Sequence, residues 1–260
     1  MAYDGGITCR KRGAAMTRTI ETAAGRRIAY CRTAGAGPGV VFLGGFMSDM
    51  GGTKALHLQD WAERTGRAFL RFDYSGHGES GGRFEDGAIG DWAEDARAVI
   101  ETLTDGPQVL VGSSMGGWIG LLIARALPQR VAGLVTIAAA PDFTEAGFWA
   151  GMDGPTRDRL MRDGVVMRPS EYDSPYPITR RLIEDGRDHL VMTRPLHLPV
   201  PVRMLQGTAD ADVPMSWALD LLGHATGDDI RLTLVKGADH RFSTPACLDL
   251  TVAAIEDVLG

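Results

Sequence analysis

A serine flanked by glycines stands where a predicted strand is followed by a predicted helix. The segment GSSMG, residues 112–116, comes after the apolar run QVLV and places Ser114 at the centre of a G-x-S-x-G pattern. Glycines two positions away on each side allow a tight, strained turn that lifts the serine hydroxyl above the sheet. A glycine-rich helix cap is the alternative interpretation. The strand before the pattern and the helix after it favour a nucleophile at Ser114.

A serine hydroxyl attacks a carbonyl only when a base lies within hydrogen-bond reach and a third group orients that base. A turn of this kind is called a nucleophile elbow. Later in the chain, the acid is expected first and the histidine last. His240 lies in the loop KGADHRFS, after the last predicted strand, and is the expected base. Asp210 in LQGTADADVP is the expected acid, whereas Asp212 in the same loop is expected to cap the following helix. Asp142 is expected to act as a hinge residue.

Negative charge that develops on a carbonyl oxygen needs preorganised donors, usually two backbone N–H groups. Met115, directly after the expected nucleophile, is predicted to supply one of them. Phe46, in the loop GGFMSDMGG at 44–52, is predicted to supply the other; a merely flexible glycine loop is the alternative. The loop DYSGHGES at 73–80 is expected to shape the mouth of the site rather than take part in the chemistry.

Three apolar residues are candidates for substrate binding. Met47 lies beside the expected oxyanion donor, and Phe143 and Trp149 lie just after the last strand of the first half. Flexible methionine and aromatic side chains could line a pocket for a fatty acyl chain. The same residues could equally be ordinary core.

Short apolar strands alternate with helices along most of the chain. Strands are expected at 40–43, 67–72, 108–112, 131–137, 200–207 and 231–236, helices at 53–65, 89–104, 114–127, 214–222 and 245–259, and a hairpin at 17–32. Strands separated by helices of this length indicate βαβ crossovers and a mostly parallel sheet. The expected fold class is therefore α/β, with helices flanking the sheet.

The alternation stops at Pro141 and resumes near residue 199. The intervening segment, 141–198, is rich in prolines and charges and has helical pieces expected at 155–163 and 177–192. A connection of this length is too long for an ordinary loop, so we expect a helical lid insertion. Residues 17–140 and 199–260 would form the core, and residues 1–16 a loose leader.

Composition excludes several classes of protein. A net charge of −6 without a basic stripe argues against a nucleic-acid partner. Three cysteines without a C-x-x-C pair make a disulfide framework or a zinc site unexpected. No apolar run is long enough for a bilayer, and no secretory signal is evident. With its arginine bias, the chain is expected to be cytoplasmic and bacterial, with neither a metal nor an organic cofactor.

Together, GGF, DYSGHGES, GSSMG, GTADADVP and GADH resemble the α/β-hydrolase superfamily along nearly the whole chain. MGGTKAL, RFDYSGHGES, GPQVLVGSSMGGW and DHR are similar to a mitochondrial abhydrolase family of acyl-protein thioesterases and acyl-glucuronide esterases. The resemblance implies a hydrolase of acyl thioesters or esters that uses Ser114, Asp210 and His240. Its substrate would be a small molecule or an acylated protein. The chain departs from the wider pattern at Gly44, where histidine is common, and this is expected to affect loop packing only.

Two rival functions remain open from the sequence. The same three side chains serve carbon–carbon bond hydrolases and cofactor-free perhydrolases. In another class, some proteins of this fold act as receptors or scaffolds without catalysis. Neither the natural acyl group nor the oligomeric state follows from the sequence.

Overall fold

An eight-stranded sheet forms the centre of the computed structural model, which describes residues 16–169 and 175–260. The predicted leader, 1–16, lies outside the described residues except for Met16. The strand order is β1-β2-β4-β3-β5-β6-β10-β12. The bounds are β1 Arg18–Glu21, β2 Arg27–Thr33, β3 Ala36–Leu43, β4 Arg67–Phe72, β5 Gln108–Ser113, β6 Val131–Ile137, β10 Val202–Gly207 and β12 Ile230–Val235.

The sheet is parallel except at one edge. β1 pairs with β2 and β2 with β4 in antiparallel register, whereas every pairing from β4 to β12 is parallel. The predicted hairpin and the predicted mostly parallel sheet are thus confirmed. Since the carboxyl ends of parallel strands share one edge, the loops that carry the candidate residues all leave from that edge.

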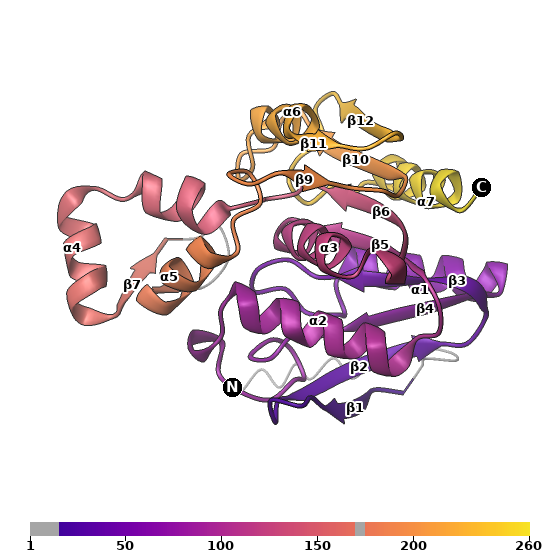
Figure 1. Cartoon of the computed structure of the whole chain (residues 1–260), viewed down its shortest axis with the longest axis horizontal. Coiled ribbons are helices and arrows are strands. Elements are labelled where there is room, and N and C mark those ends of the chain that lie inside the picture. The colour runs from indigo at the N-terminus through magenta and orange to yellow at the C-terminus, as the bar shows by residue number, and fades with distance from the viewer. Residues whose placement is uncertain (1–15, 170–174) are drawn as a thin grey trace, which may run out of the picture.

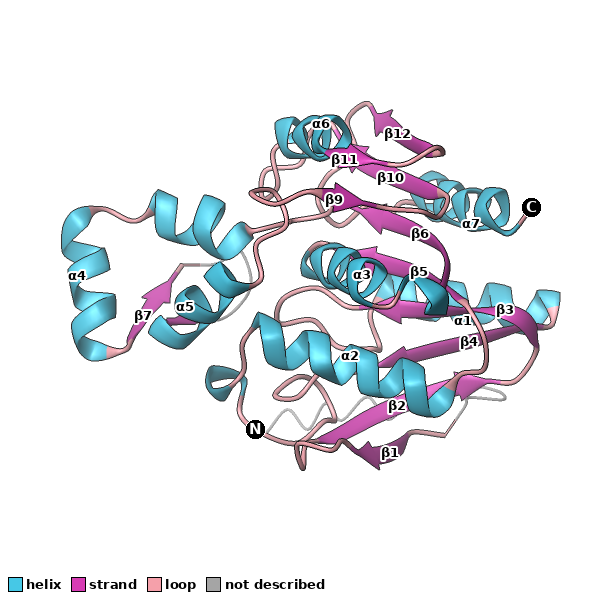
Figure 2. Ribbon diagram, viewed as in Figure 1, coloured by secondary structure: helices cyan, strands magenta, loops and turns pink. Residues whose placement is uncertain are grey.

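Helices cover both faces of the sheet (Figure 2). They are α1 Thr53–Thr65, α2 Ile89–Leu103, α3 Met115–Ala126, α6 Met215–His224 and α7 Pro245–Leu259. On one face, Trp92 of α2 and Trp118 of α3 are fully buried. On the other face, Trp61 of α1 and Ile255 of α7 pack against the strands. This double cover explains the continuous apolar runs of the central strands, because both faces of those strands exclude water.

The segment between β6 and β10 stands off one end of the sheet (Figure 1). It holds the π-helix η3 Thr144–Trp149, α4 Gly154–Asp163, β7 Val165–Arg168, β8 Tyr176–Thr179, α5 Arg180–Asp188 and β9 Leu196–His197, the last paired with β11 Ala225–Thr226. Two 3-10 turns, η1 Phe84–Asp86 and η2 Pro128–Arg130, lie elsewhere. The insertion has a small core of its own, formed by Leu160, Val166, Ile178 and Ile183.

One predicted element of the insertion is wrong. The helix expected over 177–192 begins only at Arg180, because the preceding residues form β8 and pair with β7. Ile178 is fully buried in that hairpin, opposite Val166, and its β-branched side chain suits a strand. The Thr179 hydroxyl then accepts the N–H of Leu182 and caps the helix. The expected helix at 155–163 is confirmed as α4.

The close approach of α3 to β3 requires a glycine at position 116. A Cβ there would lie 2.1 Å from the carbonyl oxygen of Leu43, which belongs to the backbone and cannot rotate away. We expect Gly116→Ala to lower the free energy of unfolding by about 1–3 kcal/mol, the usual cost of overpacking. Urea unfolding measures the difference. Gly151→Ala is the matched control, since a Cβ at Gly151 meets open space; equal stability of the two variants would contradict the prediction.

Candidate active site

Ser114 occupies a strained turn between β5 and α3. Its backbone has φ 54° and ψ −116°, in the left-handed half of φ space that few non-glycine residues adopt. Its carbonyl oxygen accepts the N–H groups of Gly117 and Ala140, which hold the turn in place. A Cβ at Gly112 would lie 2.3 Å from the Gly116 carbonyl oxygen, so this turn excludes a side chain there. The predicted strand, turn and helix around Ser114 are confirmed.

The structure brings the three predicted residues together. His240 Nε2 lies 3.1 Å from Ser114 Oγ, and His240 Nδ1 lies 2.9 Å from Asp210 Oδ2. Because the carboxylate can only accept, Nδ1 carries the proton and Nε2 is free to accept one from the serine hydroxyl. A proton can therefore move from Ser114 to an imidazole that Asp210 already orients.

The Asp210 carboxylate is fully engaged. Oδ1 accepts the N–H groups of Asp212 and Val213, at 2.9 and 2.8 Å, and Oδ2 accepts His240 Nδ1 and Gln206 Nε2. Burial by itself would raise the pKa of this carboxyl, but the hydrogen bonds, led by that from His240, lower it below its ordinary value. Asp210 is thus held ionised beside the imidazole.

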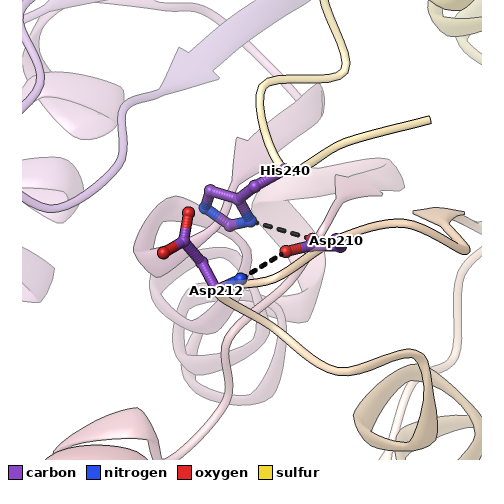
Figure 3. Close-up of side chains that lie close together, drawn as sticks. All are labelled: Asp210, Asp212 and His240. Atoms are coloured by element: carbon purple, nitrogen blue, oxygen red, sulfur yellow. Dashed lines mark hydrogen bonds and ion pairs between the residues drawn. The ribbon is translucent and has the colours of Figure 1, made fainter. Parts of the chain in front are cut away.

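The second aspartate of this loop has a place that the sequence did not predict. The N-cap residue of α6 is Pro214, so the expectation that Asp212 caps this helix is wrong. The exposed Asp212 carboxylate instead lies beside the His240 ring, on the side away from Asp210 (Figure 3). One ligand atom from each of Asp210, Asp212 and His240 lies within 4.8 Å of the others, a grouping that could attract a cation. A metal ligated by His240 Nδ1 would have to break its bond to Asp210.

The loop that follows β3 passes beside the serine. A Cβ at Gly45 would lie 3.6 Å from the Ser114 Cβ, so the adjoining Phe46 backbone is close to the elbow. Met115 is the first residue of α3, and the N–H groups of a helix's first turn have no partner within the helix. Met115 and the residue before Phe46 therefore lie beside Ser114, and the donation of the Phe46 and Met115 N–H groups to an oxyanion stays a prediction. The Phe46 ring itself packs edge-on against Phe84 and Phe143.

The three predicted substrate-binding residues have different surroundings. Met47 is 43% exposed, whereas Phe143 is buried with its ring against Trp118. Trp149 stacks with two guanidinium groups, those of Arg157 and Arg187, 5.1 and 4.6 Å from the centre of its ring. That these three residues bind substrate stays a prediction. Their surroundings could not be read from the sequence, because the contacts of Phe143 with Trp118 and of Trp149 with Arg187 join segments far apart in the chain.

A pocket of about 260 Å³ opens at the root of the insertion. In the described part of the chain it is lined by Pro141, Asp142, Glu145, Ala146, Leu190, Met192, Thr193, Trp217 and Asp220, and not by Met47, Phe143 or Trp149. Its walls come from both ends of the insertion and from α6. Pro141 directly follows Ala140, whose N–H binds the Ser114 carbonyl oxygen, so the pocket begins close to the elbow.

Asp142 ties the two ends of the insertion together. Its buried carboxylate accepts the N–H groups of Val191 and Met192, at 2.8 and 2.9 Å. Burial raises the pKa of this carboxyl, although the two backbone donors oppose the shift. The predicted hinge residue thus lies at the base of the insertion and fixes the spacing of its two connections to the core.

Comparison with known proteins agrees with this fold. Residues 39–163 match the family model for the alpha/beta hydrolase fold. The chain is 36% identical over 234 residues to bovine palmitoyl-protein thioesterase ABHD10, mitochondrial, covering 89% of this chain and 76% of that protein. Among solved structures, a protein from Agrobacterium vitis S4 superimposes with a TM-score of 0.90 at 42% identity, covering 94% of this chain and 99% of that one. Mouse alpha/beta hydrolase domain-containing protein 10 superimposes with a TM-score of 0.87 at 31% identity, covering 94% of this chain and 98% of that one.

The predicted cytoplasmic location gains no support from these relatives. The ABHD10 relatives are named as mitochondrial proteins, which points to a different compartment for that branch of the family. Among the described residues, the structure contains no helix of the length and apolarity that a bilayer crossing needs.

The hydrogen bonds of Asp210 predict a pH-dependent stability. We expect Asp210→Asn to lower the free energy of unfolding at pH 7 by about 1.5–3 kcal/mol, the range for hydrogen bonds to a charged group. Since the folded-state pKa lies below the ordinary 3.8, this contribution is present above about pH 4 and is lost as the pH falls through the folded pKa. In urea unfolding, the difference in the free energy of unfolding between wild type and Asp210→Asn should decrease from pH 7 to pH 3. Asp249→Asn, on an exposed position of α7, should show no such trend.

Proposed function

Because this chain belongs to the α/β-hydrolase superfamily, near its ABHD10 thioesterases, we propose that it is a serine hydrolase of carboxylic thioesters and esters. The observation that carries the proposal is the continuous hydrogen-bonded path from Ser114 Oγ through the His240 ring to Asp210. A nucleophile, a base and an orienting carboxylate are the parts that acyl transfer through a serine requires.

In the first half of the reaction, His240 Nε2 takes the proton of Ser114 as Oγ attacks the acyl carbonyl carbon. The Asp210 carboxylate stabilises the imidazolium that forms. The carbonyl π electrons move to oxygen, and the N–H groups of Phe46 and Met115 bind this oxyanion. When the tetrahedral intermediate collapses, the C–S or C–O bond breaks and His240 protonates the leaving thiol or alcohol. Ser114 is left as an acyl ester.

In the second half, a water molecule takes the place of the leaving group. His240 accepts a proton from this water, whose oxygen attacks the acyl carbon, and the Ser114 ester then breaks as His240 returns the proton to Oγ. The products are the carboxylic acid and the free enzyme. The cycle needs no metal ion or organic cofactor, and the helical insertion serves as the lid over it.

We propose a thioester as the substrate, with its acyl chain in the pocket at the root of the insertion. Leu190, Met192 and Trp217 give that pocket apolar walls, and it begins near the elbow. The ABHD10 relatives are named as palmitoyl-protein thioesterases. The exposed Asp212 carboxylate beside His240 supports a neutral leaving group over an anionic one such as a glucuronate, since two negative charges close to each other repel.

Replacement of the nucleophile tests the proposal directly. We expect Ser114→Ala to reduce turnover of a p-nitrophenyl acyl ester and of an acyl thioester by about 10⁶, as in comparable serine enzymes, with the urea unfolding curve unchanged. Ser216→Ala, at an exposed position of α6, is the matched control and should retain wild-type rates. Retention of more than about a hundredth of the wild-type rate by Ser114→Ala would remove Ser114 from this role.

The rival functions give different results with the same protein. A fluorophosphonate probe should label the wild type and not Ser114→Ala, whereas a receptor or scaffold would not be labelled. A panel of acyl thioesters, acyl esters and β-diketones, with and without hydrogen peroxide, separates a thioesterase from a carbon–carbon bond hydrolase and a perhydrolase. Faster turnover of β-diketones or peroxide than of thioesters would contradict the proposed substrate class.

The charge of Asp212 predicts a measurable preference. We expect Asp212→Asn to raise kcat/KM for an acyl glucuronide about fivefold relative to its neutral glucoside ester, because a unit charge at close range in water is worth about 1 kcal/mol. Both kcat/KM values should be measured at low and high salt, and the difference should shrink as salt increases. An equal change in kcat/KM for the two esters would show that the charge of Asp212 does not act on the charge of the leaving group.

A further inference from the structure

A buried histidine outside the proposed catalytic residues contacts the loop that carries the oxyanion donor. His77, in DYSGHGES, is only 4% exposed, and its Nε2 accepts the N–H of Met47 at 3.3 Å. Met47 directly follows Phe46. The contact between His77 and Met47 joins two loops 30 residues apart in the chain.

The other ring nitrogen determines the tautomer of His77. Nδ1 lies 3.2 Å from the carbonyl oxygen of Ser75, and a carbonyl can only accept, so Nδ1 carries the proton. Nε2 is then unprotonated and can accept the Met47 N–H. Burial lowers the pKa of His77 to about 4, which keeps the ring neutral at physiological pH. Both contacts are therefore satisfied by a single neutral tautomer.

Packing fixes the plane of the His77 ring. The rings of Phe84 and Trp92 each have their centres 5.1 Å from it in edge-to-face arrangements. The Trp92 Nε1–H also donates to the Ser75 carbonyl oxygen, at 3.0 Å. Phe46 packs 4.9 Å from Phe84 in the same aromatic cluster. His77 thus has little freedom to rotate away from Met47.

The loop of residues 44–52 is held in an unfavourable conformation. Met47 has φ 54°, in the left-handed region that disfavours a side chain. A second bond fixes the loop three residues on, where Asp73 Oδ1 accepts the Met50 N–H at 2.6 Å. A Cβ at Gly78 would lie 2.1 Å from Asp73 Oδ2, so the DYSGHGES turn leaves room for that carboxylate only with glycine there. Two side chains of one loop therefore hold two N–H groups of the other.

We propose that His77 is a positioning residue: by holding the Met47 N–H, it aims the adjacent Phe46 N–H at the oxyanion that forms beside Ser114. This role rests on the proposed function, in which Phe46 is an oxyanion donor. Without the bond, Met47 can relax toward an ordinary φ, which rotates the Phe46–Met47 peptide unit. The Phe46 residue must then shift with it, and its N–H loses its alignment with the oxyanion. Misplacement of such a group by about 1 Å can cost 10²-fold in rate.

Two substitutions separate this role from simple packing. His77→Gln carries an amide oxygen near the place of Nε2 and can still accept the Met47 N–H, whereas His77→Asn keeps a donor near Nδ1 for Ser75 and cannot reach Met47. We expect kcat to fall about 10- to 100-fold in His77→Asn with KM little changed. His77→Gln should stay within about fivefold of wild type.

A trifluoromethyl ketone thioether gives a second readout. Ser114 Oγ adds to its ketone carbon, the serine proton moves to His240, and the resulting oxyanion occupies the donor site. Affinity for this ketone should fall in His77→Asn by the same factor as kcat, while affinity for the product fatty acid should not change. Loss of activity in His77→Gln that equals or exceeds the loss in His77→Asn would overturn the positioning role, since Ser75 would then be the contact that matters.

Nitrogen-15 NMR of wild-type protein tests the inference without any variant, in case His77→Asn does not fold. The His77 ring should be the neutral tautomer with its proton on Nδ1, and the Met47 amide signal should shift when the trifluoromethyl ketone binds. A proton on Nε2 would overturn the inference, because Nε2 could not then accept. Failure of the fluorophosphonate to label wild type would instead refute the proposed function, so the two failures are distinguishable.

Discussion

The strained turn at Ser114 is the constraint on which the rest of the site depends. Backbone in this region costs about 1–3 kcal/mol and persists only where its surroundings over-determine it. Here the carbonyl oxygen of Ser114 is bound by two N–H groups. Gly112 lets β5 approach α3, and Gly116 lets α3 approach β3, more closely than any side chain would permit. Relaxing the turn would lower Oγ towards the sheet and separate it from His240.

Two further layers of contact hold the partners of the serine. Each oxygen of the Asp210 carboxylate accepts two hydrogen bonds. Its position therefore depends on Gln206 and on the backbone of its own loop as well as on His240. The loop of residues 44–52 is bound by two side chains of the DYSGHGES turn, those of His77 and Asp73. The reacting groups therefore stand on loops, but each loop is tied to rigid neighbours at the same edge of the sheet. Preorganisation of this kind is what lets backbone donors stabilise a developing charge.

Much of the fold and the site could be predicted from residue patterns. The strand at 67–72, the helix at 53–65 and the last helix begin and end where periodicity and turn residues placed them. Ser114 was identifiable because the glycines on each side of it are what a tight turn between a strand and a helix requires. His240 and Asp210 were identifiable because each follows a predicted strand of a parallel sheet. These signals are local, and the shared carboxyl edge of parallel strands converts them into proximity.

Other features were decided by contacts between distant segments. The hairpin of β7 and β8 depends on pairing across the insertion, so helical spacing alone misplaced the start of α5. Asp212 faces His240 instead of capping α6, and His77 faces Met47, because each contact joins loops whose approach no local pattern encodes. The sequence by itself therefore determined which residues could do chemistry and which edge carries them. Only the tertiary structure decided which side chains orient them, since hydrogen-bond partners and close packing depend on positions in space and not on spacing along the chain.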